Sequence, residues 1–265
     1  MEYLHLVLLA LVQGITEFLP ISSSGHLVLL PRLAGWEDQG LAYDVAAHFG
    51  SLVAVVVYFR ADLARLAGAW AGSLSGGGLT TEARLAWAVL VGTIPVGLVG
   101  LAFRDSVAEF LRDPLVIAAA TVGFGVLLGA ADLLGRRRRD VESITLGTGL
   151  LIGIAQALAI IPGTSRSGIT MTAGLALGLT RSAAARFSFL LSVPVIFLAS
   201  GVEAVELLQA GTDASWGGIA TVALLSALTA FACIHIFLGV LERIGMMPFV
   251  VYRLLLGGVL FWLYF

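Results

Sequence analysis

The stretch from Gln13 to Gly25 reads QGITEFLPISSSG and interrupts an apolar region, residues 3–31, near its middle. A second apolar region, residues 144–180, is interrupted in the same way by QALAIIPGTSRSG, which runs from Gln156 to Gly168. Each flank has only about 12–18 residues, whereas an upright membrane helix needs about 20. Non-helical backbone at membrane depth is stable only where protein or a water-filled cavity satisfies its polar groups. We therefore predict that each region is a re-entrant helix–loop–helix hairpin.

The composition is that of a membrane protein. Apolar residues make up 59% of the 265 residues and charged residues only 12%, and the mean hydropathy is +1.00. A soluble domain carries about 25% charged residues, so much of the usual solvated surface is missing. The net charge of −2, without a separate basic domain, argues against a nucleic-acid partner. The single cysteine, Cys233, excludes disulfide scaffolds and thiolate metal clusters.

Six further apolar segments are near the length of a membrane span. They lie near residues 45–59, 85–103, 114–134, 187–203, 217–241 and 248–265. We expect an all-α integral membrane fold in which the first repeat, residues 1–134, contains the first hairpin and three spans. A basic loop, residues 135–143, leads to the second repeat, residues 144–265, with the second hairpin and three spans.

Residues match between the two repeats in a constant order. The matched pairs lie 143, 138 and 134 positions apart, and they are Gln13 with Gln156, His48 with Arg186, and Pro114 with Pro248. A hairpin returns to its own side of the membrane and three spans do not. The second repeat must therefore enter from the opposite face, which predicts an inverted-topology repeat with both interrupted regions meeting near the midplane.

The arginines predict the orientation in the membrane. One face receives most of them, including Arg136–Arg139, and such a face is expected to be cytoplasmic. A nucleic-acid patch is the alternative reading of Arg136–Arg139, but a juxtamembrane anchor is favoured. Both termini and the mouth of the first hairpin are then expected to face outward.

Two charged residues, Glu17 and Arg166, lie inside these apolar regions. A charge at the centre of a span costs roughly 2.5–3.5 kcal/mol on insertion scales, so such residues need partners and usually serve a function. Gln13 and Glu17 are four residues apart and share one helical face. Hairpins that enter from opposite sides are expected to bring Glu17, Ser23, His26 and Arg166 within reach of one another.

This set of side chains suits a phosphate. Backbone N–H groups at the start of a half-helix form an anion site, and an arginine matches phosphate oxygens with two donors at once. A carboxylate and a histidine can transfer protons, and a serine can act as nucleophile. The residues expected to bind substrate or phosphate are Gln13, Ser22, Ser24, Gly25, Gly163, Thr164, Ser165, Ser167 and Gly168. The pattern favours phosphoryl chemistry on a lipid-borne phosphate.

These motifs resemble those of the bacterial undecaprenyl-diphosphatases of the bacitracin-resistance type. That family has a (Glu/Gln)-x-x-x-Glu motif that continues into Phe-Leu-Pro-x-Ser-Ser-x-Gly-His, followed later by Pro-Gly-x-Ser-Arg-Ser-Gly. Here the matching segments are Gln13–His26 and Pro162–Gly168, and the similarity extends along the whole chain. Gln13 stands where some members carry Glu, which weakens a role for a first carboxylate.

The resemblance implies a multi-pass phosphatase of the bacterial inner membrane. It would turn undecaprenyl diphosphate into undecaprenyl phosphate and inorganic phosphate, and so recycle the lipid carrier for peptidoglycan and cell-wall synthesis, with consequences for cell shape and for bacitracin resistance. The active site would open outward. The catalytic residues implied are Glu17, Ser23, His26 and Arg166, with Ser23 chosen among the serines by the resemblance.

Several alternatives stay open at this point. A lipid-phosphate flippase would use the same anion site, and fold alone does not decide between transporter and enzyme. Each site residue also has a structural reading: Glu17 and the serines as caps, Arg166 as a snorkelling side chain, and His26 as a packed ring. The sequence leaves open a Mg²⁺ or Ca²⁺ ion bridging Glu17 and the diphosphate, a covalent or a direct-water route, and a homo-oligomer.

Overall fold

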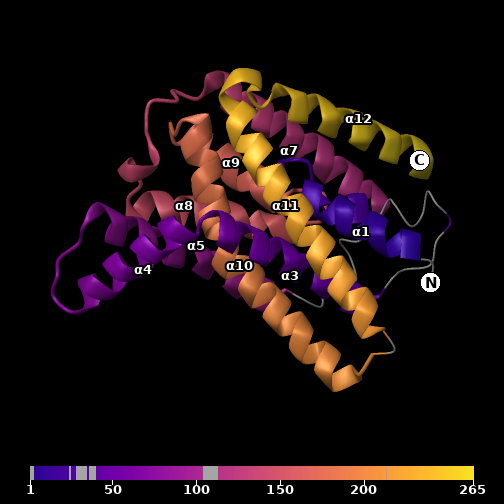
Figure 1. Ribbon diagram of the computed structural model, residues 1–265. Coiled ribbons are helices and arrows are strands. Elements are labelled where there is room, and N and C mark those ends of the chain that lie inside the picture. Colours follow the sequence, from indigo (N-terminus) through magenta and orange to yellow (C-terminus); the bar gives the residue numbers. More distant parts are fainter. Residues whose placement is uncertain (1–2, 24, 28–34, 36–39, 104–112, 213) are drawn as a thin grey trace.

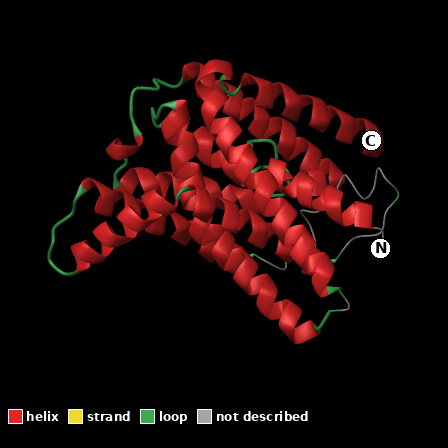
Figure 2. Ribbon diagram, in the orientation of Figure 1, coloured by secondary structure: helices red, strands yellow, loops and turns green. Residues whose placement is uncertain are grey.

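The computed structural model describes all residues except 1–2, 24, 28–34, 36–39, 104–112 and 213. The elements of the described chain are helices joined by loops, and these residues form no β-strand, only an isolated bridge between Arg139 and Leu179 (Figure 2). The expected all-α architecture is confirmed for these residues.

Among the described residues, six helices are long and apolar enough to cross a membrane, and each expected span overlaps one of them (Figure 1). They are α3 (Leu41–Tyr58), α5 (Thr81–Ala102), α7 (Pro114–Leu134), α10 (Arg181–Ala210), α11 (Trp216–Ile244) and α12 (Met247–Tyr264). The chain is therefore a multi-pass membrane protein by the length and composition of its helices. One further helix, α4 (Arg60–Leu74), is mostly exposed and follows α3 directly.

The two interrupted regions contain short helices. In the first, α1 (Tyr3–Thr16) ends just before Glu17. In the second, α8 (Leu146–Ala157) and the 3-10 turn η2 (Leu158–Ile160) precede a loop, and α9 (Arg166–Ala176) follows it. A second 3-10 turn, η1 (Val141–Ser143), lies between α7 and α8. The helix breaks therefore fall where the sequence predicts them.

The two helix breaks have the same local backbone conformation and the same kind of cap. Ser22 and Ser165 both have positive φ angles, 76° and 69°. Each hydroxyl also accepts a hydrogen bond from the backbone N–H three residues later, from Gly25 at 3.3 Å and from Gly168 at 3.1 Å. A positive φ is unfavourable for serine, but the capping bonds satisfy N–H groups that a helix start leaves free.

Helices from the rest of the chain pack closely against those of the two interrupted regions. α1 packs against α11, α8 packs against α5, and α7 lies against both α9 and α12. Glycines allow this approach: a Cβ at Gly153 of α8 would lie 2.2 Å from the carbonyl oxygen of Gly92 in α5. Small residues at such contacts are typical of helices packed in lipid.

Candidate active site

Glu17 lies buried at the end of α1, with both carboxylate oxygens bonded. Oε2 accepts hydrogen bonds from the Gln13 side-chain amide at 3.0 Å and from the Ser23 hydroxyl at 3.1 Å. Oε1 accepts from Nη2 of Arg166 at 2.8 Å. Of the four side chains predicted to meet, Glu17, Ser23 and Arg166 are joined by these bonds, across loops that are far apart in the sequence, whereas the hydrogen bonds of His26 go to Ser22 and Tyr252.

Arg166 is the first residue of α9 and reaches across to the first loop. Its Nη1 donates to the backbone carbonyl of Ser188 in α10 at 3.3 Å, and the guanidinium carbon lies 5.9 Å from the ring centroid of Phe18. The side chains of Arg166 and Glu17 are only 13% and 8% exposed. Because a buried ion is costly to leave alone, each residue depends on the other for its charge to be tolerated.

Most hydroxyl groups of the two loops form hydrogen bonds with backbone groups of the loops. Ser167 donates to the carbonyl of Leu19 at 2.8 Å, which ties the second loop to the first. Ser22 and Ser165 cap the following turns, so their oxygens already have partners. Thr164 is the exception, because its hydroxyl is buried and has no hydrogen-bond partner among the described residues. Ser24, also expected at this site, lies outside the described residues.

Arg253 of α12 is a second buried cation beside the loops, and its side chain is completely inaccessible. Its Nη1 donates to the carbonyl of Thr164 at 2.9 Å and to that of Pro20 at 3.4 Å. Its other nitrogens bond the carbonyls of Gly163 at 2.9 Å, Thr121 at 3.0 Å and Ala120 at 3.5 Å. A guanidinium offers five donors, and here all its acceptors are backbone carbonyls. Arg253 thus joins both loops to α7, a role that the sequence did not reveal.

Glycine is required beside this contact. Gly163 has a φ of 92°, and a Cβ there would lie 2.4 Å from the carbonyl oxygen of Ile117 in α7. A side chain at this position would force the second loop away from α7. Gly163 therefore positions the loop, and its carbonyl is one of the acceptors of Arg253.

His26 faces α12. Its Nδ1 lies 2.6 Å from the carbonyl oxygen of Ser22, and its Nε2 lies 2.5 Å from the hydroxyl of Tyr252. The two rings are stacked, with centroids 5.6 Å apart. A carbonyl can only accept, so Nδ1 carries the proton in this bond and Nε2 of the neutral ring accepts from Tyr252. His26 thus has Tyr252 of α12 as a hydrogen-bond partner at Nε2, a partner that the motif did not include.

The residues offer little to a metal ion by themselves. Among the described residues, no three His, Cys, Asp or Glu side chains gather into a set that could hold one. Glu17 is a single carboxylate already paired with Arg166. A divalent cation at this position would take its remaining ligands from water and from substrate phosphates, as Mg²⁺ often does.

We predict that Arg253→Met destabilises the protein strongly. The substitution leaves buried loop carbonyls without their donor, at roughly 1–3 kcal/mol for each one left unsatisfied. Thermal unfolding in detergent measures the effect, with Arg243→Met, which alters an exposed arginine at the end of α11, as the control. Equal midpoint temperatures of unfolding for the two variants would contradict the conclusion that Arg253 stabilises the two loops.

Comparison with known proteins identifies the family. Residues 6–259 match the family described as bacitracin resistance protein BacA. The undecaprenyl-diphosphatase of Nitrosococcus oceani is 60% identical over 264 residues, which cover 100% of both chains. The proteins of the same name from Hahella chejuensis and Thioalkalivibrio sulfidiphilus are each 57% identical over 265 residues, covering 100% of this chain and 99% and 100% of theirs. The resemblance carried by the two loop motifs is thereby confirmed, and the chain belongs to the BacA family of bacitracin resistance proteins.

Proposed function

We propose that this chain is a membrane phosphatase that hydrolyses undecaprenyl diphosphate to undecaprenyl phosphate and inorganic phosphate. The observation that carries the proposal is the buried Glu17–Arg166 ion pair, with the Ser23 hydroxyl on the other oxygen of the same carboxylate. Full-length relatives at 50–60% identity carry the name of this activity. A general base, a hydroxyl and a phosphate-binding cation are the groups that phosphoryl transfer needs.

Arg166 binds the terminal phosphate in this mechanism. Two of its five N–H donors form hydrogen bonds within the described residues, one to Glu17 and one to Ser188. The guanidinium can therefore donate its other N–H groups to phosphate oxygens. The start of α9 adds free backbone N–H groups and the positive end of a helix dipole. As the phosphoryl group transfers, its negative charge spreads over the peripheral oxygens, and these donors stabilise it there.

Ser23 and Glu17 act on the phosphorus from the first loop. In the covalent route, Glu17 takes the hydroxyl proton and the Ser23 oxygen bonds to the terminal phosphorus. The bond from phosphorus to the bridging oxygen breaks, undecaprenyl phosphate leaves, and water then releases inorganic phosphate from the serine. In the direct route, Ser23 orients a water that gives a proton to Glu17 while its oxygen bonds to the terminal phosphorus, and the bond from phosphorus to the bridging oxygen breaks as undecaprenyl phosphate leaves. His26 exchanges a proton through Nε2, where Tyr252 is its partner. A bridging Mg²⁺ or Ca²⁺ stays an alternative source of positive charge.

The topology proposed for the chain is an inverted repeat of residues 1–134 and 144–265, each with a re-entrant hairpin, 3–31 or 144–180. The shared cap at Ser22 and Ser165, 143 positions apart, supports this arrangement. The loop 135–143 with Arg136–Arg139 then faces the cytoplasm. This topology assigns Arg32, Arg104 and Arg112 to the outer face, and all three lie outside the described residues.

In the cell, this activity would recycle the lipid carrier that wall polymers use. We place the chain in the inner membrane with its site facing outward, where the diphosphate is released. Bacitracin resistance, cell-wall biogenesis and cell shape would then depend on its turnover. The residues that form the site all belong to one chain. The proposed mechanism is therefore compatible with a homo-oligomer but does not require one.

A lipid-phosphate flippase is the second candidate, because inverted repeats with broken helices are typical of transporters. Binding alone gives no reason for a serine hydroxyl on the carboxylate of Glu17. The deciding experiment measures inorganic phosphate released from undecaprenyl diphosphate by purified protein in detergent, without a membrane gradient. Hydrolysis predicts release proportional to enzyme, whereas a flippase alone releases none.

Arg166→Lys is predicted to retain the charge and lose most of the activity. Lysine lacks the planar pair of donors, so the loss should appear in kcat as well as KM, at about 2–4 kcal/mol of transition-state stabilisation. Steady-state phosphate release measures it, with Arg243→Lys as the control. A folded Arg166→Lys protein with wild-type kcat would remove Arg166 from the transition state.

Ser23→Ala is predicted to lower turnover by about 10²-fold or more, because it removes either the nucleophile or the group that orients water. Ser75→Ala, which alters an exposed serine after α4, is the matched control. Rapid acid quench with substrate labelled at the terminal phosphate separates the routes, since labelled protein appears only in the covalent one. Near-normal turnover of Ser23→Ala would exclude Ser23 from both.

The topology is tested with single cysteines in a Cys233→Ala background. Cysteines at the exposed positions Ser75 and Arg138 should react only after the membrane is permeabilised. A cysteine at Thr212, exposed after α10, should react in intact cells with an impermeant maleimide. Labelling of all three from one side would refute the inverted repeat.

A further inference from the structure

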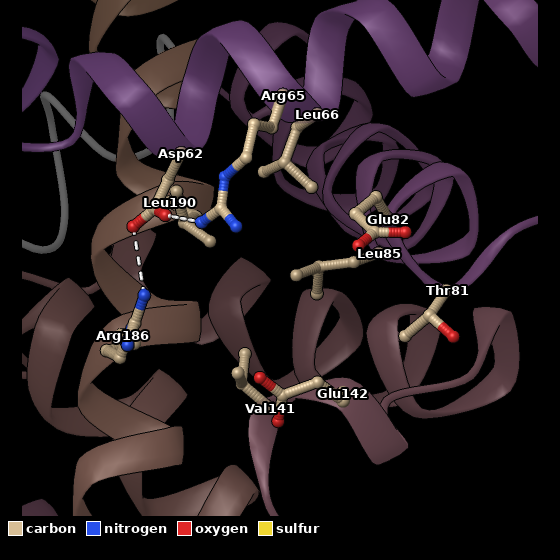
Figure 3. Close-up of a pocket in the computed structure, with 10 residues that line it drawn as sticks. All are labelled: Asp62, Arg65, Leu66, Thr81, Glu82, Leu85, Val141, Glu142, Arg186 and Leu190. Carbon is tan, nitrogen blue, oxygen red and sulfur yellow. Dashed lines mark hydrogen bonds and ion pairs between the residues drawn. The ribbon is translucent and has the colours of Figure 1, made fainter.

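A polar cavity separate from the candidate active site lies between four elements, α4, α5, α10 and η1 (Figure 3). Its volume is ≈ 80 Å³, several times the roughly 10–15 Å³ that one water needs. It lies between the N-terminal parts of α4 and α5, the second and third turns of α10, and the turn η1, on the side of the molecule that carries the basic loop. None of the residues assigned to catalysis or phosphate binding lines it.

The charges around this cavity are of both signs. The central pair of contacts is made by Asp62, which accepts from Nη2 of Arg186 at 2.9 Å and is also ion-paired with Arg65 (Figure 3). The carboxylates of Glu82 and Glu142 line the same cavity, and neither has an ion pair among the described residues. Two unpaired carboxylates therefore face two arginines that are already partly neutralised.

Both arginines keep donors for a ligand. Each uses one terminal nitrogen for Asp62, and a guanidinium has five N–H groups. The side chains of Arg65 and Arg186 are 67% and 41% exposed. The cavity thus offers acceptors for a cationic group at Glu82 and Glu142, and donors for an anionic group at Arg65 and Arg186.

An apolar groove continues from the cavity along the helices. Leu66 and Leu190 line both spaces. The groove then follows α5 through Ala86–Leu90 and α10 through Leu190–Phe197, further from the charged helix ends, and Trp70 of α4 also lines it. Its volume is ≈ 440 Å³, within the range of about 300–1,000 Å³ typical of ligand pockets.

We propose that this cavity and groove form a binding site for a zwitterionic aminophospholipid, phosphatidylethanolamine in chemical type. The lipid ammonium lies between Glu82 and Glu142, the lipid phosphate contacts Arg65 and Arg186, and an acyl chain fills the groove. An ammonium supplies three N–H donors for the carboxylates, whereas a quaternary choline supplies none. A purely anionic headgroup would meet two uncompensated carboxylates. Charge complementarity therefore selects the amine, and the site is independent of the hydrolytic reaction.

The test is native mass spectrometry of the full-length protein released from detergent. Delipidated protein is incubated separately with phosphatidylethanolamine, phosphatidylcholine and phosphatidylglycerol of identical acyl chains. We expect one ethanolamine lipid retained per chain, with a preference over choline of about fivefold, equivalent to roughly 1 kcal/mol. Equal retention of the three lipids, or tighter retention of phosphatidylglycerol, would overturn the proposal.

Variants assign the preference to this site. Glu82→Gln with Glu142→Gln should abolish the preference for ethanolamine while leaving phosphate release in lipid-free detergent unchanged. Asp140→Asn, an exposed neighbour on the same side that does not line the cavity, should keep the preference. Ala67→Trp, which fills the groove from α4, should reduce retention of every lipid. A preference that survives Glu82→Gln with Glu142→Gln would place the lipid elsewhere.

Discussion

The buried ion pair between Glu17 and Arg166 joins the two loops of the candidate active site. Each charge lies inside an otherwise apolar region, and neither is tolerated there alone. The pair can form only if the breaks in both regions lie at the same depth in the membrane. It therefore constrains where α1 ends and where α9 begins. Binding of a phosphate would give Arg166 a new anionic partner and leave Glu17 free to accept a proton. In the proposed mechanism, the same contact stabilises the protein without substrate and takes part in the reaction when substrate is bound.

The two loops share a backbone and differ in chemistry. Ser22 and Ser165 cap in the same way, but the next residue is Ser23 in the first loop and Arg166 in the second. The first loop therefore supplies the hydroxyl and carboxylate, and the second supplies the cation. Arg253 donates hydrogen bonds to backbone carbonyls of both loops. These bonds fix the spacing of the loops, and they involve no carboxylate that could pair with the positive charge of Arg166.

Much of this arrangement could be predicted from the sequence, because the physics involved is local or one-dimensional. The length of apolar segments predicted the six spans, and the cost of a charge in lipid predicted that Glu17 and Arg166 need partners. The partners of Arg253 could not be predicted, since backbone carbonyls leave no sequence signature. The contact of His26 with Tyr252 depends on how α12 packs against the first loop, and pair spacing along the chain carries no information about it.

The most direct test of the account is a structure of the protein bound to a polyprenyl analogue in which a methylene group replaces the bridging oxygen of the diphosphate. The account predicts that the terminal phosphonate lies within hydrogen-bond distance of the Arg166 guanidinium and the N–H groups at the start of α9, with the Ser23 oxygen facing its phosphorus. A headgroup bound instead in the polar cavity beside Arg65 and Arg186, with the Glu17–Arg166 contact undisturbed, would contradict it.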